Sequence, residues 1–266
     1  MTLRTLLISA AAITPLLSCS IKEVRSGCPC RLAVDISDAS GEYNCVTISA
    51  EDMDKNTLHT ENTSLANTKV HRLEVPRTDI RVVCMQGLDR CSSDGRNVFI
   101  PLGNESDRIM SGYDCADCHG ETAECKIKFH KDWAELTIVY ASPGEASYPY
   151  KISVSGMING FDAGTRTPSE GPFKCDAIDT ADESNSVHLY LPRQKPSGTG
   201  LTMTLSGRDD DAAIKSYDLS SLITETGFDW TAEDLDDIRI GIDYSGVITY
   251  MTVIDWSTGM EMTIVI

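Results

Sequence analysis

The chain has 266 residues, with 23 basic and 40 acidic side chains and a formal net charge of −17. So large a negative charge argues against binding to nucleic acid or to anionic lipid surfaces. Hydrophobic residues make up 41% of the chain, enough to build real cores, which excludes a disordered protein.

The first eighteen residues have the pattern of a lipoprotein signal peptide. Arg4 gives a basic start, and residues 6–17 form an apolar run that is too short for the roughly 20 residues of a membrane-spanning helix. Residues 16–19 (LLSC) then read as a lipobox. We expect residues 1–18 to be removed and Cys19 to carry the acyl chains, palmitate among them. The alternative is an ordinary signal peptide beside an incidental cysteine.

The residue after this cysteine, Ser20, is not aspartate, which favours sorting to the outer membrane. We therefore expect the mature protein to be held there by its N-terminal lipid; that it faces outward is an extrapolation from this.

Nine further cysteines remain for an oxidising compartment, and eight of them lie between Cys28 and Cys125. Disulfides are expected there, mainly in the N-terminal half, with one thiol left over. Their connectivity stays open.

Apolar and polar residues alternate with a period of two along much of the chain, which is typical of strands that bury one face. The expected strands are 31–36, 45–49, 70–75, 80–85, 134–140, 150–154, 187–191, 201–205, 238–242 and 262–266. Two short helices are also expected. One covers 219–226 and is ended by Gly227, and the other opens at a capping box, Thr231 to Asp234.

The polar stretch 103–120 resembles a loop and marks a candidate domain junction. We therefore predict an all-β protein of two tandem Greek-key sandwiches. The domains expected are 19–120 and 121–266, with the helices in the second.

Cys115, Cys118 and His119 form a C-x-x-C-H motif, which in exported proteins is the attachment site of a c-type haem. The alternative is a cysteine-rich segment that happens to include a histidine. We favour the alternative, because cytochrome c domains are helical and this motif lies between strand-rich regions. Zinc on the same residues and Cys125 has suitable donors but requires reduced cysteines.

Nothing in the sequence indicates an enzyme. The chain lacks H-E-x-x-H, G-x-S-x-G, P-loop and G-x-G-x-x-G motifs. Trp133, Trp230 and Trp256 could form a platform that stacks on sugars, and a surface glycan-binding lipoprotein is the second functional hypothesis. Packing at the edge of a core fits their positions at least as well.

Four stretches of the chain form a recognisable series. They are residues 19–29 (CSIKEVRSGCP), the segment 73–83 (LEVPRTDIRVV), residues 191–194 (LPRQ), and the C-terminal set 227–230 (GFDW), 234–238 (DLDDI), 242–244 (IDY) and 255–256 (DW). Together they resemble the FimB/Mfa-type fimbrial subunit family of Bacteroidota, lipoproteins that anchor or terminate fimbriae. The resemblance covers nearly the whole mature chain and is weakest around the C-x-x-C-H motif.

The resemblance implies two transthyretin-like sandwiches, no enzymatic activity, and assembly into a surface-exposed fimbrium with fimbrillin-type structural subunits as partners. We expect no cofactor and no metal. It also directs attention to the last expected strand, where Met262, Ile264 and Ile266 share one face. An apolar strand at a chain end should be paired, either within its own sandwich or as a strand donated to a neighbouring subunit.

Overall fold

The computed structural model describes residues 27–266 except 67–68, 141–149, 180–184, 197–199 and 208–211. The strands of the first half are β1 (Cys30–Asp35), β2 (Cys45–Asp52), β3 (Thr57–Ser64), β4 (Val70–Val75), β5 (Asp79–Gln86), β6 (Ser92–Ser93), β7 (Asn97–Phe99), β8 (Met110–Asp117), β9 (Thr122–Lys126) and β10 (His130–Lys131). The second half contains β11 (Trp133–Tyr140), β12 (Tyr150–Asp162), β13 (Thr167–Asp176), β14 (Ile178–Asp179), β15 (Ser186–Pro192), β16 (Thr202–Gly207), β17 (Ala213–Asp218), helix α1 (Leu219–Glu225), β18 (Asp237–Ile242), β19 (Ile248–Ile254) and β20 (Glu261–Val265).

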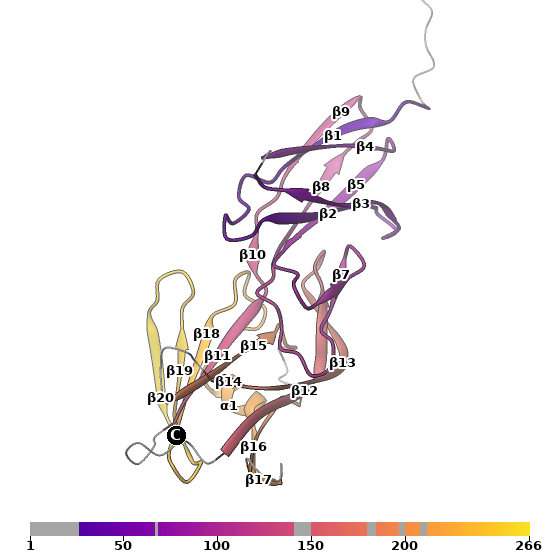
Figure 1. Ribbon diagram of the computed structural model, residues 1–266. Coiled ribbons are helices and arrows are strands. Elements are labelled where there is room, and N and C mark those ends of the chain that lie inside the picture. Colours follow the sequence, from indigo (N-terminus) through magenta and orange to yellow (C-terminus); the bar gives the residue numbers. More distant parts are fainter. Residues whose placement is uncertain (1–26, 67–68, 141–149, 180–184, 197–199, 208–211) are drawn as a thin grey trace, which may run out of the picture.

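The strands form two sandwiches, one above the other in Figure 1. In the N-terminal sandwich a three-stranded sheet, β4-β1-β9, faces a five-stranded sheet, β10-β8-β5-β2-β3. In the C-terminal sandwich the sheet β14-β15-β11-β18-β19-β20 faces β17-β16-β12-β7-β6, with β13 also paired to β12. Each sandwich encloses its own apolar core. The predicted all-β class is confirmed.

The strand pairing crosses the domain boundary expected between residues 120 and 121. β9 lies after that point but pairs in parallel with β1, and β10 pairs with β8. Conversely, β7 comes from the first half of the chain and pairs with β12 in the C-terminal sandwich. The change of sheet therefore falls after β10, and a hairpin from the first segment completes the second sandwich.

Two local expectations were wrong. The stretch 103–120 is not a loop throughout, because β8 occupies much of it and pairs with β5. The second helix does not form: residues 231–234 adopt turns. The carboxylate of Asp234 accepts a hydrogen bond from the backbone N–H of Lys131 at 2.8 Å and so is used for tertiary contact. The first helix is confirmed as α1, and Gly227 after it has a φ of +78°.

Charged side chains are buried where the two sandwiches meet. Arg96, in the turn between β6 and β7, pairs with Glu51 of β2 and donates from Nε to Asp162 of β12 at 2.9 Å. Close by, Asp132 is fully buried between β10 and β11 and pairs with Arg193 at 2.9 Å. Each of these buried charges thus has a partner of opposite sign, and the contacts of Arg96 join residues of the two sandwiches.

A small apolar cluster fills the same junction. It combines Val83 and Met85 of β5 with Val98 of β7 and Phe161 of β12, all fully buried. Apolar burial across the junction adds to the ion pairs. The result in Figure 1 is an elongated molecule whose β1 end and C-terminus lie at opposite extremes.

Candidate functional site

The strand nearest the C-terminus, β20, is the outermost strand of the six-stranded sheet. It pairs antiparallel with β19 on one side, and no strand of the described chain pairs with its other side. β20 forms because Thr263 and Ile264 face Thr252 and Met251 of β19 in register. Figure 1 shows it at the margin of the lower sandwich, next to the C-terminus.

The apolar side chains of β20 are exposed rather than packed in a core. Met262 is 52% exposed, Val265 is 83% exposed, and Ile266, just beyond the strand, is 53% exposed. Ile264 is half-buried. The residues singled out from the sequence, Met262, Ile264 and Ile266, therefore lie on or beside an edge strand that contributes little to its own core.

β20 also lacks the features with which proteins usually protect a sheet edge. Natural edge strands carry lysine, proline, bulges or several charges that prevent pairing with another chain. The edge strands β3, β4 and β17 have such polar or charged sequences, TLHTENTS, VHRLEV and AIKSYD. β20 reads EMTIV, with one charge at its start. Its outer edge is therefore a surface suited to receiving a strand.

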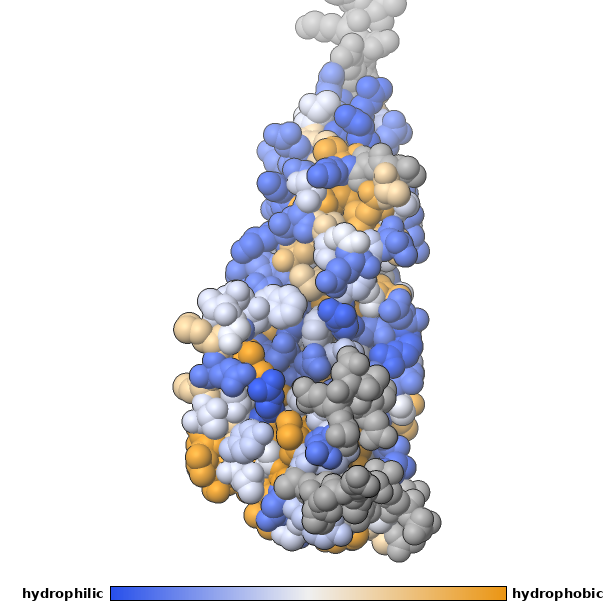
Figure 2. All heavy atoms as spheres, turned by 60° about the vertical axis from the view of Figure 1, so that its left-hand side comes forward, coloured by the Kyte–Doolittle hydropathy of each residue, from blue (hydrophilic) through white to orange (hydrophobic). Residues whose placement is uncertain are grey.

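The turn before β20 fixes where this edge lies. Asp255 accepts hydrogen bonds from Thr258 and Ser257. These hydrogen bonds, the one from Thr258 first, lower the pKa of Asp255. Gly259 follows with a φ of +67°, a conformation that favours glycine. In Figure 2, apolar residues reach the surface at the lower left of the molecule, over the C-terminal sheets.

The three tryptophans do not form an open platform. Trp133 and Trp230 are buried, and Trp256 is 43% exposed. Trp133 and Trp256 lie edge to face with their ring centroids 6.0 Å apart. Both rings pack on the fully buried Lys131, whose Nζ lies 4.1 Å from the Trp133 centroid and 4.7 Å from that of Trp256. Their role is packing, which does not favour the glycan-binding hypothesis.

The residues of the C-x-x-C-H motif point in different directions. The Cys115 and His119 side chains are exposed, whereas Cys118 is buried in the core of the N-terminal sandwich. Attachment of a c-type haem needs both thiols and the imidazole around one ring. The structure does not bring these three groups together, and it places the motif at the end of strand β8.

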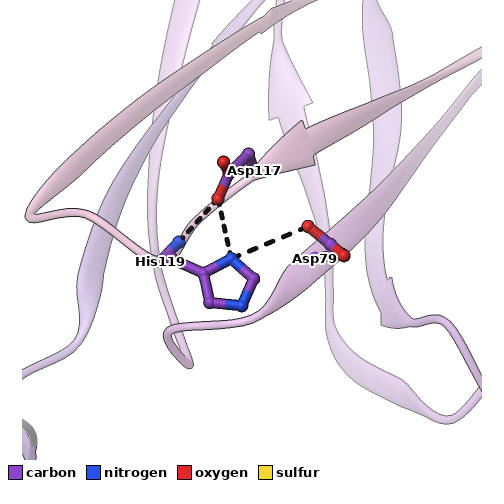
Figure 3. A group of neighbouring side chains, drawn as sticks. All are labelled: Asp79, Asp117 and His119. Atoms are coloured by element: carbon purple, nitrogen blue, oxygen red, sulfur yellow. Dashed lines mark hydrogen bonds and ion pairs between the residues drawn. The ribbon is translucent and has the colours of Figure 1, made fainter.

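His119 instead contacts two aspartates on the surface (Figure 3). Its Nδ1 lies 2.7 Å from Asp117 and 3.8 Å from Asp79. The hydrogen bond to Asp117 raises the pKa of His119, and the backbone hydrogen bond from His119 lowers the pKa of Asp117. All three groups are exposed, so the arrangement is a solvated ion pair that orders the turn after β8.

The predicted lipidation site, Cys19, lies outside the described residues. The first described segment leads directly into β1, at the extreme of the molecule opposite β20 (Figure 1). The described part of the chain contains no helix with the length and apolarity needed to cross a bilayer.

Sequence reasoning missed the buried charges at the junction. Arg193 belongs to the LPRQ segment, but nothing in that segment shows that its guanidinium also donates to the carbonyl oxygens of Trp230 and Ala232, at 2.9 and 2.7 Å. Nothing in the sequence around Asp132 indicated that its carboxylate would be buried at the junction. A signal would have required pairing information between residues about sixty positions apart in the chain.

Together these features define a class: an elongated all-β protein of two sandwiches with an open sheet edge remote from its N-terminal end. No protein-family model and no curated protein matches the chain. Solved structures do share its fold.

One such structure is the fimbrial anchor protein Mfa2 from Porphyromonas gingivalis, with a TM-score of 0.61 at 12% identity over 88% of this chain and 99% of that one. Another, provisionally described as polysaccharide-binding, comes from Bacteroides thetaiotaomicron, with a TM-score of 0.64 at 10% identity over 88% and 98%. A third, provisionally described as an adhesin, comes from Bacteroides ovatus, with a TM-score of 0.59 at 12% identity over 88% and 96%. The chain thus shares its fold with these structures, one of which is a fimbrial anchor protein, and the two-sandwich fold is the one that the sequence resemblance implied.

Proposed function

We propose that this protein is a non-enzymatic subunit of the FimB/Mfa type, a lipoprotein that anchors a fimbrium to the bacterial outer membrane. The observation that carries the proposal is the two-sandwich fold shared along almost the full length of the anchor protein Mfa2. The motifs from residue 73 onward, which resemble those of the family, lie within that fold. The absence of an H-E-x-x-H or G-x-S-x-G motif agrees with a structural role.

The two extremes of the molecule have different tasks in this proposal. Cys19, eleven positions before β1, carries the lipid and holds one end at the membrane. Several acyl chains hold a protein stably, whereas one holds it only marginally. The open edge of β20, at the side of the other sandwich (Figure 1), pairs with a strand of a fimbrillin-type subunit. Main-chain hydrogen bonds then provide affinity, and alternate side chains set the register.

Replacement of the lipidated cysteine tests the anchoring role. In cells that make the fimbrium, Cys19→Ala should abolish fatty-acid labelling of the protein and release it, with attached fimbrial subunits, into the medium. Cys28→Ala is the matched control, because Cys28 is also exposed near the N-terminus and should leave labelling and anchoring intact. Labelled Cys19→Ala protein, or fimbriae that stay on the cells, would disprove the anchor.

A further inference from the structure

Two buried cysteines lie opposite each other inside the N-terminal sandwich. Cys30 is the first residue of β1, in the three-stranded sheet, and Cys118 directly follows β8, in the five-stranded sheet. Each has an exposed fraction of 0% and belongs to the same apolar core. The pair therefore spans the gap between the two sheets.

The backbone fixes this approach from both sides. Cys30 pairs with Val75 at the end of β4, and the Cys118 N–H donates to Thr78, just beyond Val75, at 3.2 Å. The N–H of Arg31 also donates to the carbonyl oxygen of Glu121 at 3.0 Å. The segments that carry the two cysteines are thus held to the same turn and to each other.

The Cys118 side chain interacts with that of Cys30. Burial and then the neighbouring Cys30 thiol, to which Cys118 is hydrogen-bonded, raise the pKa of Cys118 to about 12. In the closed sandwich Cys118 is therefore neutral and unable to act as a thiolate nucleophile. Both sulfurs are also fully buried, which keeps an external disulfide from reaching them, so the reaction between them takes place before the sheets close over them.

The exposed cysteines fit Cys118 less well. Cys115 is exposed and stands on β8 opposite Arg81, whereas Cys118 is in the core, so the C-x-x-C spacing does not bring their side chains onto one face. Cys28 is exposed as well, so neither Cys28 nor Cys115 belongs to the core that contains Cys118.

We propose that Cys30 and Cys118 form a disulfide that ties the two sheets of the N-terminal sandwich together. The oxidant is a protein or small-molecule disulfide of the exported compartment. One cysteine thiolate attacks that disulfide and releases one thiol. The second cysteine then attacks the mixed disulfide and releases the other. One S–S bond is broken, one is formed, and the oxidant leaves as two thiols.

The bond has a mechanical consequence, which rests on the proposed lipid anchor. Tension between the membrane and a fimbrium enters the fold at the start of β1. A covalent link at the first residue of that strand transfers the tension to β8 in the opposite sheet, so β1 cannot be peeled away. The disulfide itself requires only export to an oxidising compartment, and its test is independent of fimbrial binding.

Peptide mapping of the full-length exported protein tests the pairing directly. The protein is isolated without reductant, alkylated with N-ethylmaleimide and cut before aspartate and after glutamate. These cuts separate Cys118, in residues 117–121, from both Cys115 and Cys125. The expected product is residues 117–121 linked to residues 24–34, and fragmentation at the Cys28–Pro29 bond then distinguishes Cys30 from Cys28.

Single variants give a second readout that depends on alkylation alone. Cys30→Ala should leave Cys118 alkylated in denatured, unreduced protein, and Cys118→Ala should do the same for Cys30. The controls Cys28→Ala and Cys115→Ala should keep the link. In the wild type, unfolding, reduction and refolding under reductant should lower the Tm by roughly 5–10 °C, and less in the Cys30→Ala, Cys118→Ala double variant.

Three outcomes would overturn the proposal. They are a Cys115–Cys118 link, a Cys118–Cys125 link, or Cys30 and Cys118 both alkylated in the unreduced wild type. Mapping of the wild type needs no variant, so a variant that fails to fold leaves the test intact.

Discussion

A single carboxylate, Asp107, organises the chain segment between β5 and β6. One of its oxygens accepts hydrogen bonds from the backbone N–H groups of Asp89, Arg90 and Cys91, at 2.9, 2.8 and 2.6 Å. Burial alone would raise the pKa of Asp107. The hydrogen bonds from the backbone of Cys91, Arg90 and Asp89 overcome that effect and lower it below its usual value. The ionised carboxylate thus stabilises the folded state.

Replacement of this carboxylate by an amide should reveal its contribution through pH. An acid whose folded-state pKa is depressed stabilises the fold above the unfolded-state pKa, about 3.9 for aspartate. It loses that contribution as the pH falls through the folded-state value. Asp107→Asn should therefore cost about 1–3 kcal/mol at pH 7, and the difference from wild type should shrink below about pH 4. Urea unfolding at pH 7, 5, 4 and 3 measures it.

The control for this prediction is Asp54→Asn, at an exposed position between β2 and β3. It should leave the free energy of unfolding within about 0.5 kcal/mol of wild type at every pH. A cost for Asp107→Asn that is the same at pH 7 and pH 3 would show that the charge of Asp107 does not stabilise the fold.

At the scale of elements, sequence predicted those strands whose faces differ. β4 and β11 alternate between buried and more exposed residues, and their sequences show it as a period of two. β3 was missed because its sequence, TLHTENTS, has only one apolar residue on an exposed edge. β13 was missed because it contains two prolines and a glycine, and it pairs with β12 through register shifts.

The second expected helix does not form, and the reason is different. Residues 231–234 have the side chains of a helix start. However, the Asp234 carboxylate accepts a hydrogen bond from the backbone N–H of Lys131, and the backbone N–H of Thr231 donates to the carboxylate of Asp229. Tertiary contacts therefore outweighed a weak local preference.

One part of the candidate site could likewise be predicted from the sequence, and another part could not. An apolar terminal strand is visible in the sequence, so Met262, Ile264 and Ile266 could be singled out. That β20 lies at an edge with its side chains exposed depends on the order of strands in the sheet. That order is set by long-range pairing and has no local signature.

The edge of β20 can be blocked against pairing with another chain by a substitution that does not disturb the core. Val265 is 83% exposed, so Val265→Lys should change the free energy of unfolding by no more than about 0.5 kcal/mol. A lysine on an edge strand opposes pairing with another chain, so recovery of fimbrial subunits with the protein should fall sharply. Affinity isolation from fimbriated cells, alongside thermal unfolding of the purified variant, measures both effects.

Ile214→Lys is the matched control, because Ile214 is 52% exposed on β17, the edge of the opposite sheet. It should leave recovery of fimbrial subunits unchanged. Deletion of residues 262–266 should have the same effect on recovery as Val265→Lys, with only a moderate fall in Tm because Met262 and Ile266 are exposed. Undiminished recovery with both Val265→Lys and the deletion would rule out the β20 edge as the assembly surface.

At the scale of the whole molecule, a subunit between membrane and fimbrium has to transmit force through the junction of its sandwiches. The junction contains an apolar cluster, from Val83 to Phe161, and buried ion pairs around Arg96 and Arg193. The hairpin that carries β6 and β7 links the sandwiches a second time, since it leaves the first and pairs with β12 in the second. The sandwiches should therefore unfold together.

Arg96→Ala tests that coupling, because its guanidinium contacts Glu51 in one sandwich and Asp162 in the other. Removing Arg96 leaves the buried Glu51 with Arg81, 3.7 Å away, as its one remaining ion-pair partner among the described residues, so the variant should lose about 3–5 kcal/mol. The three tryptophans belong to the C-terminal sandwich and its junction with β10, so their fluorescence reports mainly on that part of the molecule, while far-ultraviolet circular dichroism reports on both sandwiches. In guanidinium the two signals should change together in the wild type and separate in Arg96→Ala.

The matched control is Arg239→Ala, which breaks an exposed pair with Glu261. It should cost no more than about 1 kcal/mol and keep the two signals together. Separate transitions in the wild type, or an Arg96→Ala variant that unfolds like the wild type, would mean that the sandwiches are joined in space without being coupled in stability.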